Sequence, residues 1–173
     1  MKKRILTAVL AAALVTGTCA ATVSAKEEKT YTIGICQLVQ HDALDAATKG
    51  FEDAITEKMG DSVKFDEQNA QGDSNTCSTI INSFVSEGAD LILANATASL
   101  QAAAAGTSDI PILGTAVTEY GVALGIDDFD GTVGGNISGT SDLAPLDEQA
   151  DMLHELFPDA KNVGLLYCSA EPN

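Results

Sequence analysis

The fold of this chain is decided by one stretch, Tyr31–Asp45, which reads YTIGICQLVQHDALD. Its apolar first half predicts a buried strand over residues 32–38, and its polar second half predicts a loop and then a helix with Asp42 as the N-cap. Ligands of open α/β sheets bind at the carboxyl ends of the strands. Gln37 and His41 therefore lie where a ligand site is expected.

The same order of strand, polar loop and helix recurs along the rest of the 173 residues. Apolar residues at three- and four-residue steps predict helices, and short apolar runs predict strands. The expected helices span residues 42–59, 75–87, 99–105 and 146–157, and the expected strands span residues 63–69, 89–94, 110–115, 135–139 and 162–168. This alternation predicts an α/β fold, a doubly wound and mostly parallel sheet with helices on both faces.

The first 25 residues have the pattern of a secretory signal peptide. A basic start, Lys2–Arg4, precedes the apolar run Ile5–Val15, and the small residues Val23–Ala25 provide a cleavage site. The apolar run is shorter than the ~20 residues that a membrane span needs. The sequence VTGTC also resembles the lipobox of bacterial lipoproteins, although Thr18 departs from its usual small residue. Simple cleavage after Ala25 and acylation of Cys19 are both open, so we expect an exported chain, with a lipid-anchored chain as the alternative.

Composition narrows the class of partner. The chain carries 25 acidic and 9 basic residues, a formal net charge of −16, and every acidic residue follows position 25. Such a surface repels nucleic acid and anionic membranes. We therefore expect no nucleic-acid partner, and the charge is also what keeps an exported protein soluble.

No pattern in the sequence indicates catalysis, a metal site or a cofactor. His41 and His154 accompany no nucleophile motif, and neither GxSxG nor a phosphate-binding loop occurs. Three cysteines follow the leader, Cys36, Cys77 and Cys168, so at least one stays unpaired within the chain. Their spacing fits no metal site. Cys36 is expected to be a small buried hydrophobe, with a structural disulfide as the alternative.

Several motifs are similar to those of a known family. They are IGICQLVQHDALDAATKGFEDAI at 33–55, QGD at 71–73, GGNISGTSDLAPLDEQADMLHELFPDAKNVGLLY at 134–167 and the closing EPN. Together they resemble ABC-transporter substrate-binding proteins of the group associated with tryptophan and other aromatic amino acids. The resemblance covers nearly all of the chain after the leader.

The resemblance implies a type I periplasmic-binding-protein-like fold, with two similar α/β lobes joined by hinge strands and a ligand closed between them. On that template residues 1–25 are the signal peptide and residues 26–140 form the first lobe. Residues 141–173 are then the hinge crossing and the beginning of a second lobe. The similarity stops where such proteins have a further half. Either the sequence is a fragment of a longer reading frame, or the second lobe is unfinished.

Polar residues at the predicted strand ends are the candidate ligand contacts. The loop 95–99 opens a helix, and free backbone amides there suit the carboxylate of an amino acid. Asp142, at the presumed hinge, could bind the ammonium group. Glu171 and Asn173 resemble the second-lobe loop that faces the ligand, and Tyr120 could stack on an aromatic ring. The full candidate set is Gln37, His41, Asn69, Gln71, Thr97, Ala98, Ser99, Thr118, Asp142, Glu171 and Asn173.

Each candidate also has a structural interpretation. His41 could simply be an exposed loop residue, Asn69 and Gln71 could cap the next helix, and Asp142 could cap a helix or be solvated. These alternatives stay open at the level of the sequence.

The sequence favours a non-enzymatic, exported solute-binding protein of an ABC importer. It is expected to act as a monomer, to capture a small ligand between two lobes and to deliver it to a membrane permease. An amino acid, and an aromatic one as the finer expectation, follows from the resemblance alone. One alternative is an exported single-domain α/β enzyme with a flavodoxin-like sheet, such as a hydrolase. Another is a ligand-sensing partner of a membrane receptor.

Overall fold

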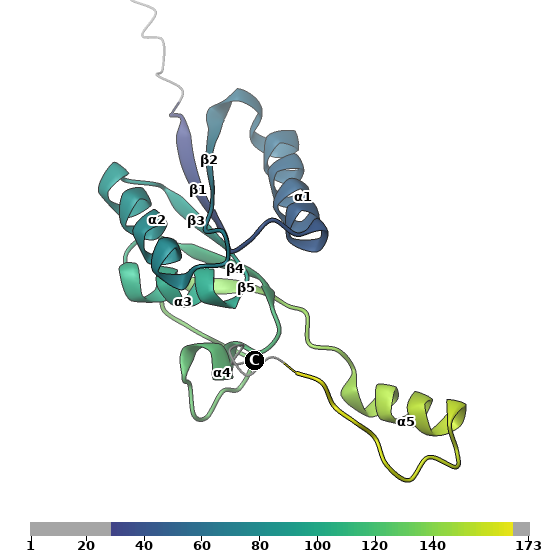
Figure 1. Cartoon of the computed structure of the whole chain (residues 1–173). Helices are drawn as coiled ribbons and strands as arrows, with labels where there is room; N and C mark the ends of the chain where they lie inside the picture. The colour runs from purple at the N-terminus through teal and green to yellow at the C-terminus, as the bar shows by residue number, and fades with distance from the viewer. Residues whose placement is uncertain (1–28, 168–173) are drawn as a thin grey trace, which may run out of the picture.

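The computed structural model describes residues 29–167, which form one five-stranded sheet with flanking helices (Figure 1). The strands are β1 (Tyr31–Gln37), β2 (Val63–Asn69), β3 (Leu91–Asn95), β4 (Ile112–Val117) and β5 (Ile137–Ser141). Their order is β2-β1-β3-β4-β5, and every neighbouring pair is parallel. The predicted leader, Cys19, Cys168, Glu171 and Asn173 lie outside the described residues, and what we expect of them stays a prediction.

Helices cover both faces of the sheet, which confirms the predicted doubly wound α/β fold. They are α1 (Asp42–Met59), α2 (Ser74–Glu87), α3 (Thr97–Gly106), α4 (Tyr120–Leu124) and α5 (Leu146–Leu156), with a short 3-10 turn, η1, at Gly60–Ser62. In Figure 1, α1 lies on one side of the sheet, and α2 and α3 lie on the other. None of the helices within residues 29–167 is both long and apolar enough to cross a membrane.

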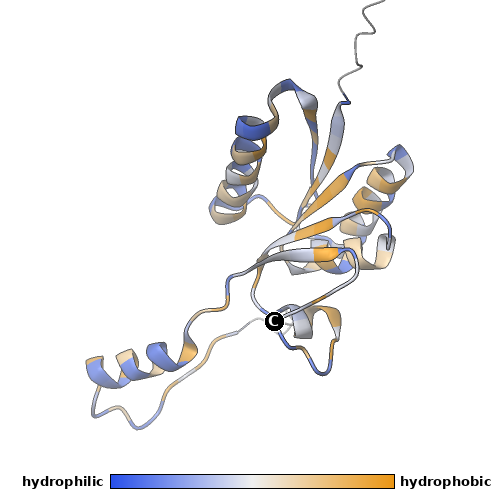
Figure 2. Cartoon of the chain, turned by 180° about the vertical axis from the view of Figure 1, so that it is seen from behind, coloured by the Kyte–Doolittle hydropathy of each residue, from blue (hydrophilic) through white to orange (hydrophobic). Residues whose placement is uncertain are grey.

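The larger part of the core lies between the sheet and α2 and α3. Phe84 of α2 and Leu100 of α3 are buried there with Ile92 of β3. The smaller part lies under α1, where Ile33, Ile35 and Leu93 meet apolar residues of that helix. Figure 2 shows apolar residues gathered along the central strands, while hydrophilic residues lie on the outward turns of α1.

The α2 helix approaches β1 closely because Gly34 has no side chain. A Cβ atom built on Gly34 would lie 2.6 Å from the ring of Phe84, a distance that real contacts do not reach. The ring therefore packs directly on the strand backbone. This contact fixes α2 over β1 and determines which of their other side chains meet.

Several elements differ in detail from the prediction. The N-cap of α1 is His41 rather than Asp42, since the His41 side chain accepts a hydrogen bond from the Ala43 N–H. The α3 helix begins at Thr97, two residues before the expected start, because Ala96 makes the turn out of β3. The α4 helix, Tyr120–Leu124, was not expected at all. The short strand predicted at 135–139 is found two residues later, as β5.

The predicted buried strand over residues 162–168 is wrong for its described part. Residues 161–167 have no regular secondary structure and are exposed. A strand needs a neighbour to satisfy its backbone groups, and the described residues place none beside this segment. The apolar residues of α5 are also exposed, Leu146, Met152 and Leu156 among them. In Figure 1, α5 and the segment after it extend away from the sheet.

Candidate ligand-binding site

The residues at and just after the carboxyl ends of the five strands form one continuous rim, which we call the carboxyl edge. It consists of residues 38–42, 70–74, 96–99, 116–119 and 141–143. Backbone hydrogen bonds join these loops: Gly72 N to Leu38 O (2.7 Å), Leu38 N to Asn95 O (3.2 Å), Ala96 N to Thr115 O (2.9 Å) and Asp142 N to Val117 O (3.2 Å). Because these bonds join each loop to a neighbouring loop or strand end, the sheet holds the edge together.

The chain changes direction in the middle of this edge. After β1 it passes outward to β2 by way of α1 on one face, and after β3 it passes toward β4 by way of α3 on the other face. The loops after β1 and β3, which are neighbours in the sheet, thus diverge onto opposite faces. Such a topological switch point is where open α/β sheets bind ligands. The centre of the site is therefore expected between His41 and Ala96.

Unfavourable backbone geometry is concentrated at the same edge. Within residues 29–167, the non-glycine residues with positive φ are Gln71 (55°), Ala96 (86°) and Ala116 (52°). Gln71 follows β2, and Ala96 follows β3. Ala116 lies near the end of β4, where the pairing with β5 shifts register. Ala96, with ψ of 162°, is in a region that is essentially restricted to glycine. Each such residue costs about 1–3 kcal/mol, and they cluster at functional sites.

The first turn of α3 has backbone donors that no N-cap side chain satisfies. Its N-cap is Ala96, which has no polar atom to offer. In contrast, α1, α2 and α4, which also begin at this edge, are capped by the side chains of His41, Asp73 and Glu119. The initial N–H groups of a helix point outward and carry its positive dipole end. The start of α3 can therefore bind an anion such as a carboxylate.

Two of the three candidates in this turn are turned inward. Thr97 and Ser99 are buried, and the Ser99 hydroxyl lies 3.5 Å from the sulfur of Cys36 and 3.6 Å from that of Cys77. The Ser99 side chain thus belongs to the core. The backbone N–H groups of Thr97, Ala98 and Ser99 form the first turn of α3.

Gln37 is held in a buried amide network that the sequence did not reveal. Its Oε1 accepts from the Thr48 hydroxyl (2.7 Å), and its Nε2 donates to Asp45 Oδ1 (2.6 Å). Asn95 Nδ2 donates to the same Thr48 hydroxyl and to the Leu44 carbonyl, each at 2.9 Å. Since every polar atom of Gln37 has a partner, this residue positions the start of α1 and with it His41.

One polar atom of this network lacks a hydrogen-bond partner within residues 29–167. Asn95 Oδ1 is buried and has no hydrogen-bond partner in the described residues. A buried acceptor without a donor costs about 1–3 kcal/mol, and an ordered water or a ligand usually satisfies it. Asn95 therefore joins the residues of interest at the carboxyl edge. The only sign of it in the sequence was a polar residue directly after an apolar run.

The loops after β1 and β2 present exposed polar groups. His41 Nδ1 accepts from Ala43 N (3.2 Å), so in the neutral ring Nε2 carries the proton and can donate to a ligand. Asn69 Oδ1 accepts from both the backbone and the side chain of Gln71 (2.9 and 3.1 Å). The cap of α2 is Asp73, so the interpretation of Asn69 or Gln71 as that cap is wrong.

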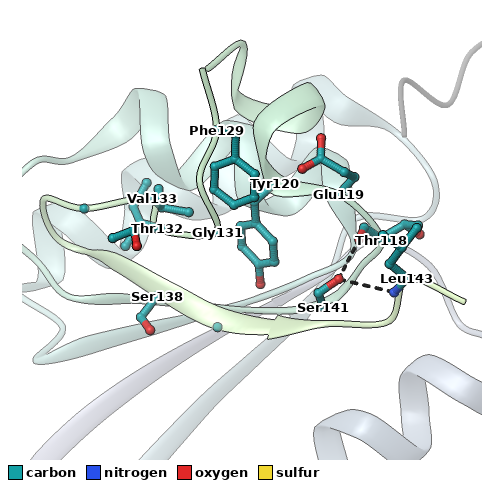
Figure 3. Close-up of a pocket in the computed structure, with 13 residues that line it drawn as sticks. Thr118, Glu119, Tyr120, Phe129, Gly131, Thr132, Val133, Ser138, Ser141 and Leu143 are labelled. Atoms are coloured by element: carbon teal, nitrogen blue, oxygen red, sulfur yellow. Dashed lines mark hydrogen bonds between the residues drawn. The ribbon is translucent and has the colours of Figure 1, made fainter. Parts of the chain in front are cut away.

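Beside β5 the structure has a hollow of about 490 Å³, lined by residues of α4, β5 and the loop before β5 (Figure 3). Tyr120 and Phe129 lie in it, and the Tyr120 hydroxyl donates to the Thr140 carbonyl (3.2 Å). The same hydroxyl rests against Gly114 and Gly139, where a Cβ atom would collide with it. Burial, and then the charge of Asp142, raise the pKa of Tyr120. Tyr120 is therefore an uncharged side chain that packs α4 against β4 and β5.

The end of β5 is ordered by Ser141. Its hydroxyl donates to the Thr118 carbonyl (2.6 Å) and accepts from Leu143 N (3.2 Å), as the dashed lines in Figure 3 show. These bonds guide the chain out of the sheet. Asp142, between them, is exposed.

The strand order limits which candidates can meet on one small ligand. Gln71 follows β2 and Asp142 follows β5, at opposite ends of the sheet. Four strand spacings of ~4.8 Å separate them by about 19 Å, more than the length of a free amino acid. The structure does bring His41, the start of α3 and Thr118 to adjacent strands at the centre.

A five-stranded parallel α/β lobe with such an edge is of the class found in periplasmic-binding-protein-like proteins. The family model described as ABC transporter substrate binding protein matches residues 32–173, and the chain belongs to that family. It is a family of binding proteins rather than enzymes, which removes the hydrolase alternative. Substrate-binding proteins of this kind work outside the cytoplasm.

Individual relatives agree. The chain is 45% identical to a tyrosine-binding protein of Clostridioides difficile over 149 residues, 84% of this chain and 43% of that protein. A domain from Streptococcus pneumonia solved with L-Trp is 35% identical (TM-score 0.76; 84% and 50% covered). A ligand-free, open substrate-binding protein with adhesive properties from Clostridium difficile is 42% identical (TM-score 0.69; 82% and 49% covered). The chain thus spans about half the length of these relatives.

Proposed function

We propose that this chain is the first lobe of an extracytoplasmic binding protein that captures an aromatic amino acid and delivers it to an ABC permease. The family membership supports the class. Relatives that bind tyrosine and L-Trp support the ligand. The observation that carries the proposal is the start of α3, with its uncapped amides behind the strained Ala96 at the centre of the carboxyl edge.

In this proposal the ligand carboxylate binds the N–H groups of Thr97, Ala98 and Ser99. His41 Nε2 flanks it from the neighbouring strand β1, and Thr118 flanks it from β4. Asp142 follows β5, two strand spacings or about 10 Å from the start of α3. It therefore serves a ligand group that is remote from the carboxylate. No side chain of α3 competes for the amides, so the anion site is preformed.

The second half of the site belongs to a second lobe in this proposal. Residues 141–146 cross to it, and Glu171 and Asn173 face the ligand from that side. Ligand contacts to both lobes then favour a closed form over an open one, which is binding by population shift. The exposed apolar residues of α5 are consistent with a helix that packs within such a lobe.

Isothermal titration calorimetry on the full-length protein that contains this chain tests the proposal. L-Trp, L-Tyr and L-Phe are compared with aliphatic and charged amino acids, and each aromatic ligand is compared with its primary amide. The amide keeps the ring and the ammonium group but removes the carboxylate charge. We expect aromatic amino acids to bind, and their amides to bind at least about tenfold more weakly. If no amino acid in the panel binds, the amino-acid function is excluded.

A further inference from the structure

Two cysteines from different elements meet in the core. Cys36 of β1 and Cys77 of α2 are fully buried, and both are free thiols. The Cys36 sulfur donates to the Ser99 hydroxyl at 3.5 Å, and the Cys77 sulfur lies 3.6 Å from the same oxygen. Both sulfurs therefore contact the same oxygen at the interface between β1 and α2.

The close packing of α2 on β1 holds the two cysteines on facing surfaces of one interface. Cys36 and Gly34 lie on the same face of β1, two residues apart, and Cys77 and Phe84 lie two helical turns apart on the inner face of α2. The Phe84 ring touches the strand at Gly34 without an intervening side chain. The helix therefore lies directly on the strand, and small cysteine side chains bridge the same interface further along.

We propose that Cys36 and Cys77 are oxidised to a disulfide that links β1 to α2 in the extracytoplasmic protein. The oxidant is a disulfide, carried by a thiol oxidoreductase or by a small molecule. One cysteine thiolate attacks it and forms a mixed disulfide, and the second cysteine displaces the carrier. Two S–H bonds break and one S–S bond forms in the protein. The two electrons reduce the S–S bond of the oxidant, which leaves as two thiols with the two protons.

The environment indicates when the bond forms. Burial raises the pKa of Cys36 to about 12, with a further rise from Cys77 and a partial opposing effect of the Ser99 hydrogen bond. The folded lobe therefore holds almost no thiolate at this position, and thiolate is the reactive form. The exchange takes place during folding, before α2 closes over β1. Once formed, the bond is shielded from reductants by the same burial.

This inference depends on the extracytoplasmic location of the family and not on the identity of the ligand. To test it, the full-length protein is unfolded in urea with reductant and refolded with oxidised and reduced glutathione. Free thiols are then alkylated, and peptides are mapped by mass spectrometry without reduction. We expect a peptide pair joined through Cys36 and Cys77. Relative to protein refolded in reductant, we expect a melting temperature higher by about 5–10 °C.

Two variants show which cysteines form the bond. Cys168→Ser removes the remaining cysteine after the leader, and both the joined peptides and the melting difference should persist. Cys77→Ala should abolish both. The proposal is overturned if Cys36 and Cys77 are alkylated in full after oxidative refolding of the unaltered protein, a result that needs no variant to fold. Cross-linking of either residue to Cys168 instead would also overturn it.

Discussion

Replacing Thr97 by proline tests the anion site at the start of α3 directly. Thr97 is the first residue of the helix, a position where proline is tolerated because its N–H has no partner within the helix. The ψ of the preceding Ala96, 162°, is compatible with a following proline, while its φ of 86° is strained already in the unaltered chain. The substitution thus removes one donor from the proposed carboxylate site while the helix is retained.

The magnitude follows from one hydrogen bond to a charged group, about 1.5–3 kcal/mol. That range corresponds to a loss of about 10- to 150-fold in affinity for L-Trp or L-Tyr, measured by calorimetry on the full-length protein. Ser74→Pro is the matched control, since Ser74 is the first residue of α2, a helix that Asp73 caps. Ser74→Pro should change the affinity by less than about twofold, which corresponds to about 0.4 kcal/mol.

A second variant separates the backbone from the side chain. Thr97→Val removes the hydroxyl and keeps the N–H, so it should bind nearly as well as the unaltered protein. If Thr97→Val loses as much affinity as Thr97→Pro, the amide is not the group that matters. Full affinity of a folded Thr97→Pro protein would equally refute the reasoning, with folding checked by circular dichroism.

Three further predictions concern stability, each measured by urea denaturation of the full-length protein. Gly34→Ala places a Cβ atom against the Phe84 ring and should destabilise by about 1–3 kcal/mol, whereas Gly50→Ala, on an open side of α1, should not destabilise; equal effects would contradict the packing argument. Thr48→Val should cost about 1–3 kcal/mol because it unpairs the buried amide network, and a neutral result would show that water replaces the hydroxyl. The pKa of Asp90 is lowered from 3.8 by the hydrogen bond from the Thr32 N–H and then by Lys29. The Asp90 carboxylate therefore stabilises the fold above pH 3.8, and this stabilisation is lost as the pH falls through the pKa of the folded state. Asp90→Asn should accordingly flatten the loss of stability below about pH 4, and an unchanged acid profile would count against it.

The central strands β1 and β3 were predictable because burial on both faces of a parallel sheet leaves unbroken apolar runs, although the apolar run at 162–167 forms no strand. The run 89–94 contains most of β3, and the alternating residues after position 62 mark β2 as an edge strand. The helix stops at Gly60 and Gly88 were equally readable, since Gly88 ends α2 in a left-handed conformation that glycine adopts without strain.

The details of the site were not predictable, because they depend on contacts between distant segments. Asn95 looked like an ordinary loop residue, but it is buried among β1 and α1 residues more than forty positions away. Ser99 looked like a ligand hydroxyl, but it faces two cysteines. The α4 helix is too short for a periodic pattern to develop, and its main signal is a glutamate cap.

The exposed segment after α5 has a practical consequence for work on the lobe in isolation. Leu165, Leu166 and Tyr167 each expose more than four-fifths of their surface, and Val163 exposes over half. A run of apolar residues with unpaired backbone groups is a template for pairing with another copy of itself. A preparation of residues 29–167 would therefore be prone to self-association. Light scattering that increases with protein concentration would then report aggregation through this exposed segment rather than a native oligomer.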